Sequence, residues 1–151
     1  MNRRRLLRGA AALPALALLA SGCGAIRRAG SEDDIPGSAD EILAAVDLPR
    51  PEFSVQLDAG PIRGDEQWSK TIAFTADATR IEDWVDAAFD GGIPSRAQTD
   101  DEEEPAARLG TGVQKKGDRV ASGTHGPHAY VVVVGQQDRP TVHVGVRREG
   151  R

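Results

Sequence analysis

The sequence predicts an α+β domain, in which a mostly antiparallel sheet of about five strands carries one main amphipathic helix on one face. Three observations favour this class. Several short runs alternate apolar and polar residues with period two, which is typical of half-buried strands. One longer run has its apolar residues at helical spacing instead. Clusters of glycine and proline separate the runs, and their order is helix, two strands, helix, three strands.

A short helix is expected where the domain begins, at Ser38. The segment Ser38-Ala39-Asp40-Glu41 forms a capping box, because the serine hydroxyl accepts the amide of Glu41 while the glutamate reaches back to the Ser38 amide. Apolar residues then share one helical face: Ile42, Leu43 and Val46. Pro49 and Pro51 end this helix, which we expect to pack on the domain or cap it.

Two strands joined as a hairpin are expected next. Residues 53–58 alternate strictly, with one apolar face formed by Phe53, Val55 and Leu57. Residues 68–75 place Trp68, Ile72 and Phe74 on one side. The connecting segment 59–66 contains Gly60-Pro61 and Gly64-Asp65, which indicates a long hairpin loop.

The strongest expected element is a helix from Thr79 to about Asp90. Thr79-Arg80-Ile81-Glu82 predicts a second capping box, and Gly91-Gly92 predicts the end of the helix. The apolar stripe consists of Ile81, Trp84, Val85, Ala88 and Phe89. Aromatic residues at this spacing indicate packing against the sheet rather than a ligand platform.

Residues 93–116 are expected to form a long connection. At its centre, Asp100-Asp101-Glu102-Glu103-Glu104-Pro105 contains five consecutive acidic residues that repel one another. A calcium site is the alternative, but the run lacks the alternating pattern of acidic residues that wraps one ion. A solvated loop is therefore the preferred interpretation.

The last third of the chain predicts three strands. The first covers about residues 118–122, and residues 123–127 form a turn into the second, residues 128–134. Both faces of this second strand are apolar, which indicates a central strand covered on both sides. After a turn at residues 135–139, Val142, Val144 and Val146 alternate with polar residues in the third strand.

Residues 1–22 have the three parts of an export signal. Arg3, Arg4, Arg5 and Arg8 form a basic head, an apolar run extends from Ala10 to Ala20, and small residues follow. The apolar run is well short of the ~20 residues that a membrane-spanning helix needs. We therefore expect a signal peptide over residues 1–22, a flexible tether over 23–37 and a single domain over 38–151.

The end of this signal resembles that of bacterial lipoprotein precursors. Their lipobox reads Leu-(Ala/Ser)-(Gly/Ala)-Cys, and Ala20-Ser21-Gly22-Cys23 matches it at three of four positions, with Ala20 in place of the usual leucine. The resemblance implies cleavage after Gly22 and a diacylglyceryl group on the thiol of Cys23, the only cysteine of the chain. Palmitate-type acyl chains then anchor the protein to the cell membrane on its extracytoplasmic face. An ordinary secretory signal with an incidental cysteine is the alternative.

The start of the signal resembles the twin-arginine export motif, Ser-Arg-Arg-x-Phe-Leu-Lys. Here the segment reads Asn2-Arg3-Arg4-Arg5-Leu6-Leu7-Arg8, with Arg3 and Arg4 as the paired arginines. The resemblance implies export of a protein that has already folded. The general secretory route is the alternative.

The charge of the chain argues against a nucleic-acid partner. The chain has 19 basic and 23 acidic residues, and four of the basic residues lie in the signal. The exported chain therefore has 15 basic and 23 acidic residues, a net charge near −8. Such a surface repels phosphate backbones, so we expect contact with the membrane through the lipid anchor and no binding of nucleic acid.

The sequence shows no catalytic constellation, and no cofactor is expected. His125, His128 and His143 are weak metal candidates, because imidazole binds zinc and copper, yet no cysteine remains to complete a closed zinc site. Ser122 with a histidine and an acid is a further combination, but no Gly-x-Ser-x-Gly elbow is present.

The preferred functional interpretation is a small, non-enzymatic binding or accessory protein at the cell surface, with an envelope protein as its expected partner. The alternative is a small-ligand or metal-binding sensor that uses the sheet face with His143 or the histidine turn. A hydrolase acting on envelope material is the third and weakest interpretation.

Overall fold

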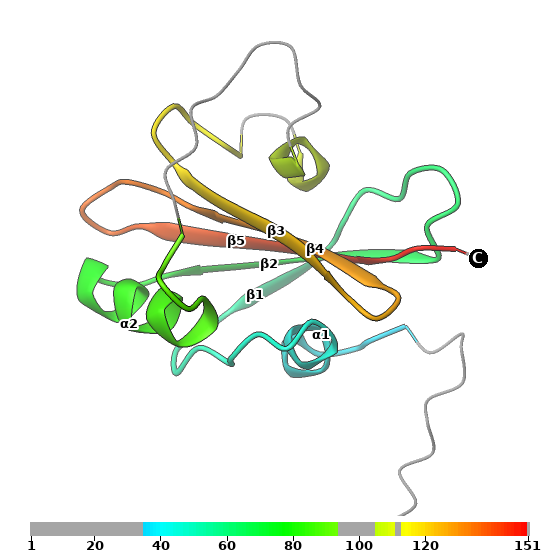
Figure 1. Ribbon diagram of the computed structural model, residues 1–151, viewed down its shortest axis with the longest axis horizontal. Coiled ribbons are helices and arrows are strands. Elements are labelled where there is room, and N and C mark those ends of the chain that lie inside the picture. Colours follow the sequence, from blue (N-terminus) through cyan, green and yellow to red (C-terminus); the bar gives the residue numbers. More distant parts are fainter. Residues whose placement is uncertain (1–34, 94–104, 111–112, 151) are drawn as a thin grey trace, which may run out of the picture. The chain divides into compact units, whose positions relative to one another are not determined.

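The sheet predicted from the alternating runs is present in the computed structural model, which describes residues 35–93, 105–110 and 113–150 (Figure 1). Its strands are β1 (Gln56–Ala59), β2 (Trp68–Thr75), β3 (Arg119–His125), β4 (His128–Val134) and β5 (Thr141–Arg148). They are arranged in the order β1-β2-β5-β4-β3, and every neighbouring pair is antiparallel. The predicted signal peptide, most of the tether and the acidic run 100–104 lie outside the described residues.

Three helical segments accompany the sheet within the described residues. They are α1 (Ala39–Ala45), α2 (Ala78–Ala88) and the short 3-10 helix η1 (Pro105–Leu109). In Figure 1, α1 and α2 lie on one side of the sheet and η1 lies on the other. The α+β class and the antiparallel sheet are therefore confirmed, whereas η1 falls in the segment 93–116 that the sequence predicts to be a plain connection.

The two faces of the sheet follow from the alternation of side chains along each strand. One face, here called the helical face, lies in the same buried cluster as the apolar residues of α1 and α2; its strand residues are Trp68, Ile72, Phe74, Val132, Val134, Val142, Val144 and Val146. The core thus takes residues from both helices rather than from one main helix. The opposite face, here called the polar face, carries the intervening residues of β2 and β5, among them Ser69, Thr71, Thr141, His143, Gly145 and Arg147.

Residues of β4 are buried on both faces, as the sequence predicts. Val132 and Val134 belong to the helical core, whereas Val131 and Val133 form a second cluster with Ala106 of η1 and Val120 of β3. The middle position of the sheet belongs to β5, however, and β4 lies beside it. The helical cover supplied by η1 explains why β4 is apolar on both sides.

The capping of the two main helices differs in how well the sequence predicts it. The capping box of α1 is confirmed: the Ser38 hydroxyl accepts the Glu41 amide, and the Glu41 carboxylate accepts the Ser38 amide. In α2 the predicted box at Thr79 is wrong, because Asp77 is the N-cap and its carboxylate accepts the amide of Arg80 at 3.1 Å. Asp77 is in the extended conformation that a cap requires, with ψ of 156°, so the helix starts one residue earlier than predicted.

The predicted strand at residues 53–58 is shifted, since β1 covers Gln56–Ala59. Phe53 leaves the strand register and packs its ring 5.3 Å from that of Phe74, with the Arg80 guanidinium 4.9 Å above it. The packing of the Phe53 side chain therefore replaces strand pairing in the residues that precede β1.

The predicted turn at residues 123–127 is too long. Strand β3 continues to His125, so only Gly126 and Pro127 separate it from β4, and Gly126 has a φ of +56°. Gly123 lies inside β3, opposite Tyr130, and a Cβ there would lie 2.6 Å from the tyrosine hydroxyl. This glycine marks a close approach between side chain and backbone rather than a turn.

Candidate functional site

The polar face is divided into two parts by η1. Along β5, the residues Thr141, His143, Gly145 and Arg147 alternate with the buried valines and therefore share this face. Leu109 of η1 covers Gly145, where a Cβ would lie 2.5 Å from its Cδ2 atom. A pocket with His143 lies on one side of this contact, and a pocket with Arg147 lies on the other.

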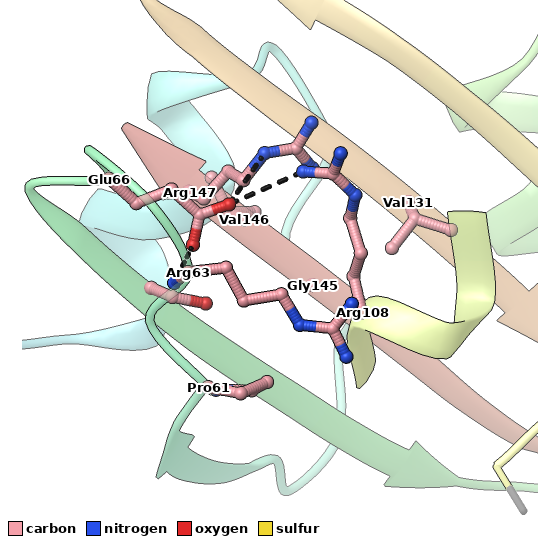
Figure 2. Close-up of a pocket in the computed structure, with 9 residues that line it drawn as sticks. Pro61, Arg63, Glu66, Arg108, Val131, Gly145, Val146 and Arg147 are labelled. Atoms are coloured by element: carbon pink, nitrogen blue, oxygen red, sulfur yellow. Dashed lines mark hydrogen bonds and ion pairs between the residues drawn. The ribbon is translucent and has the colours of Figure 1, made fainter. Parts of the chain in front are cut away.

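The second of these, here called the arginine pocket, is lined by charged residues from separate segments of the chain (Figure 2). Arg63 and Glu66 come from the loop between β1 and β2, Arg108 comes from η1, and Arg147 comes from β5. Ser69 of β2 also lines the pocket. The long hairpin loop and η1 therefore bring together side chains that are far apart in the sequence.

Glu66 is the centre of the arginine pocket, and its side chain is only 7% exposed. Its Oε1 atom lies 3.3 Å from Nη1 of Arg108 and 3.2 Å from Nε of Arg147. Its Oε2 atom accepts the backbone amide of Arg63 at 2.9 Å. One carboxylate thus holds the loop, η1 and β5 together, and two guanidinium groups share one of its oxygen atoms.

The hydrogen bonding of Arg147 is incomplete. Its Nε atom is buried and close to Glu66 Oε1, but it is not aligned for a hydrogen bond and has no other hydrogen-bond partner among the described residues. Its Nη2 atom donates to Glu149 Oε1 at 3.3 Å. A buried donor without an acceptor has a free-energy cost, which an additional oxygen atom in the pocket would remove.

Arginine is the most frequent charged residue in the lining of the arginine pocket. The residues that line it include three arginines and one glutamate. Glu149, which pairs with Arg147, lies outside this lining, where arginine predominates. This contrasts with the chain as a whole, which has a net charge of −4.

The other part of the polar face, here called the His143 pocket, is lined by polar side chains from β5 and from the loops beside it. They include Lys115, Asp118, Gln137, Thr141 and His143 around a volume of about 320 Å³. Asp118 is buried, and its carboxylate accepts the amide of Lys115 at 2.9 Å. Thr141 is hydrogen-bonded through its hydroxyl to that of Thr75 at 2.9 Å.

The protonation of His143 depends on its burial. Removal of the imidazole from water lowers the pKa of His143 below its ordinary value, while the nearby Asp118 carboxylate opposes this shift. The net direction favours a neutral imidazole, which donates one hydrogen bond and accepts another. The His143 pocket therefore offers both donors and acceptors to an uncharged polar molecule.

The other two predicted histidines lie on the opposite face of the sheet. His125 and His128 are cross-strand partners at the β3–β4 hairpin, and the His128 ring lies 5.4 Å from that of Trp68. Burial and the positive charge of Arg148 lower the pKa of His128, although the carbonyl groups of Ala45 and His125 act in the reverse direction. This environment indicates a histidine packed at the edge of the core.

The structure does not bring the predicted chemical residues together. His143 is separated by the sheet from the hairpin histidines, and the described part of the chain contains no group of three or more potential metal ligands. Ser122 is on the polar face of β3, where it is opposite Val131, and is therefore two strands away from β5 and His143.

Comparison with known proteins adds no assignment. No protein-family model, curated protein or solved structure matches this chain. The helices in the described ranges are all too short or too polar to cross a membrane.

The arginine pocket is absent from the sequence-based candidates. Arg63, Glu66 and Arg108 lie in segments that the sequence predicts to be loops, where charged residues are ordinary. Only Arg147 has a detectable signal, because it occupies the polar face of an alternating strand. Its pairing with a residue 81 positions earlier requires the folded structure.

Proposed function

We propose that this protein is a lipid-anchored, extracytoplasmic binding or accessory protein without enzymatic activity, and that it binds through the polar face of its sheet. In this proposal, Arg3 and Arg4 direct export, cleavage follows Gly22, and Cys23 carries the lipid. We also propose that α2, the longer helix, is the main cover of the opposite face together with α1, and that the polar face on either side of η1 is available for binding.

One observation carries the binding role, namely the convergence of Arg63, Arg108 and Arg147 on a pocket that contains the nearly buried Glu66 carboxylate. Three arginines gathered at one pocket of a chain with negative net charge support recognition of an external group.

The experiment for this function has two parts. The first compares the membrane fraction of cells that express the wild-type chain with that of cells that express Cys23→Ser. We expect the wild-type protein in the membrane with an acylated Cys23, and we expect the variant to be released or to remain unprocessed. A processed Cys23→Ser protein that stays in the membrane would contradict the lipid anchor.

The second part uses mild crosslinking on intact cells, followed by purification and mass spectrometry. A reproducible envelope partner that is lost when residues 38–151 are deleted supports the binding or accessory role. Recovery of the protein alone contradicts a protein partner and favours a small ligand.

A second candidate is a sensor that binds a small uncharged ligand in the His143 pocket. The volume of about 320 Å³ and the mixture of donors and acceptors favour it. Metal binding is the weaker form of this candidate, because His143 would act with Asp118 as its nearest acidic partner and without His125 or His128. Measurement of ligand-dependent changes in the NMR signals of the His143 ring tests this candidate.

A further inference from the structure

We infer that the outer edge of β3 is a self-association surface, at which two copies of this chain pair their β3 strands antiparallel about Ser122. Strand β3 is the last strand of the sheet and pairs with β4 on one side only. The pairing joins the sheets of the two copies into one continuous sheet. This inference goes beyond the proposed function, and it does not depend on binding at the arginine pocket.

The direction of the peptide groups in β3 follows from the hydrogen bonds of the neighbouring ladder. In an antiparallel sheet, one residue directs both its N–H and its C=O to the same side, and successive residues alternate. The amide of Gly135 donates to the carbonyl of Thr141 at 3.0 Å, and the amide of Glu149 donates to the carbonyl of Pro127 at 3.2 Å. Odd-numbered positions of β4 therefore face β5, and even-numbered positions face β3.

Three residues of β3 consequently direct their backbone N–H and C=O groups away from the sheet, namely Val120, Ser122 and Thr124. Within the described ranges, no backbone group outside the strand forms a hydrogen bond with them. Ser122 is the middle residue of β3, so a two-fold axis there pairs Ser122 with Ser122 of the partner copy and Val120 with Thr124. Each pair exchanges two hydrogen bonds, and every outward peptide group of these residues gains a partner.

Strand β3 lacks the features that protect an edge strand from further pairing. Its register with β4 is continuous from Arg119 to His125, without a bulge, and the strand contains neither proline nor lysine. The other edge of the sheet is different, because β1 has only four residues and Pro61 follows it closely. Of the two edges, β3 is therefore the one that can accept another strand.

The side chains on the helical face of β3 are compatible with this register. The small residues Ala121 and Gly123 lie opposite each other across the axis, so they leave room for close approach of the two backbones. Arg119 lies opposite His125 of the partner copy. Its charge is already compensated, because its Nη1 atom donates to Glu82 at 3.0 Å and its Nη2 atom contacts the same carboxylate.

The paired assembly has a consequence for binding. The two-fold axis is perpendicular to the joined sheet, so the polar faces of both copies lie on the same side. A partner that engages both faces gains affinity from the second contact, because that contact is intramolecular.

The test is sedimentation equilibrium of the purified protein in a density-matched detergent over a wide range of protein concentrations. The wild-type protein should show a reversible equilibrium between monomer and dimer. The variant Ser122→Lys should weaken the dimer by about fivefold or more, because two lysines then lie directly opposite each other at the axis. Ser54→Lys is the matched control, since it makes the same change of charge at an exposed serine before β1 and should leave the affinity unchanged.

A charge reversal tests the register itself. Ser122→Glu should also weaken self-association, whereas an equimolar mixture of Ser122→Lys and Ser122→Glu should form a heterodimer, because opposite charges then meet at the axis. Both variants should keep the far-ultraviolet circular dichroism of the wild type, since the Ser122 side chain is exposed and its peptide groups face away from β4.

A wild-type protein that stays monomeric at every concentration would overturn the inference. A dimer that Ser122→Lys weakens no more than Ser54→Lys would also overturn it, as would a mixture of the lysine and glutamate variants that forms no heterodimer. These results would leave the lipid anchor and binding at the polar face unaffected, so this failure is distinguishable from a failure of the proposed function.

Discussion

Leu109 lies directly over Gly145, so closely that a Cβ at position 145 would be 2.5 Å from its Cδ2 atom. This contact seats η1 on β5 and places the neighbouring Arg108 at the mouth of the arginine pocket. Because Gly145 has no side chain, η1 can pack directly against β5. This packing determines the position of Arg108, which comes from a distant segment of the chain.

The variant Gly145→Ala should displace η1. The new methyl group would overlap Leu109 and would lie close to Val131, so we expect a loss of about 1–3 kcal/mol in the free energy of unfolding, measured in urea. Gly37→Ala is the control, because the Cβ at that exposed position would have its nearest neighbour, a Glu41 oxygen, at 3.9 Å. Equal stability of the two variants would contradict the seating of η1 described above.

Removal of the central carboxylate should have opposite effects on stability and on anion binding. In Glu66→Gln, Arg147 and Arg108 lose their shared partner, and we expect a loss of about 2–4 kcal/mol in the free energy of unfolding. Phosphate should raise the melting temperature of this variant more than that of the wild type, since it replaces the missing negative charge. A phosphate effect that is smaller in the variant would argue against an anion site.

The N-terminal cap of α2 can be tested with a pair of alanine substitutions. Asp77→Ala removes the carboxylate that accepts the Arg80 amide, and it should cost about 1 kcal/mol of stability. Thr79→Ala lies inside the helix, where alanine has the higher helix propensity, so it should be close to neutral. If chemical denaturation shows that Thr79→Ala is the more destabilising variant, Thr79 is the N-cap, as the sequence predicts.

The pH dependence of stability should reflect His143. Because the pKa of His143 is lower in the folded protein than its ordinary 6.5, the unfolded chain binds a proton more readily. The contribution of His143 to the free energy of unfolding is therefore complete above pH 6.5. It is lost as the pH falls from 6.5 to the lower pKa that His143 has in the folded protein.

The substitution His143→Gln should flatten this part of the stability curve. His128 has a pKa shifted in the same direction, so some slope should remain in the variant. Urea denaturation at a series of pH values checks the prediction. An unchanged slope in His143→Gln would assign the pH dependence to other groups.

The local patterns of the sequence predict the framework of the fold well. The strands β2, β4 and β5 and the cap of α1 agree closely with the alternation and the capping box. These features depend on neighbouring residues, whose chemistry is visible in the sequence. The errors occur where another contact decides the structure: Phe53 packs against Phe74, Gly123 accommodates Tyr130 of the adjacent strand, and Asp77 caps the helix in place of Thr79.

The candidate site is much less predictable than the fold. Arg147 and Glu66 are 81 residues apart in the sequence, and the chemistry of the pocket arises because the pairing of β2 with β5 brings them together. The sequence suggests the histidines as metal candidates because they are close together along the chain. The side-chain alternation of β4 and β5 nevertheless places His128 and His143 on opposite faces of the sheet. A charged residue in a loop has no feature that distinguishes a binding role from a solvated one until its neighbours are known.

Binding of a ligand by the polar face through the arginine pocket can be measured by a phosphate titration followed by two-dimensional ¹H–¹⁵N NMR. We expect shifts at the amides of Arg63, Arg108 and Arg147 and at the side-chain signals of the same arginines. Signals of the His143 pocket and of Arg139 should remain in place. Shifts spread evenly over the surface, or no shifts at high phosphate concentration, would contradict the account.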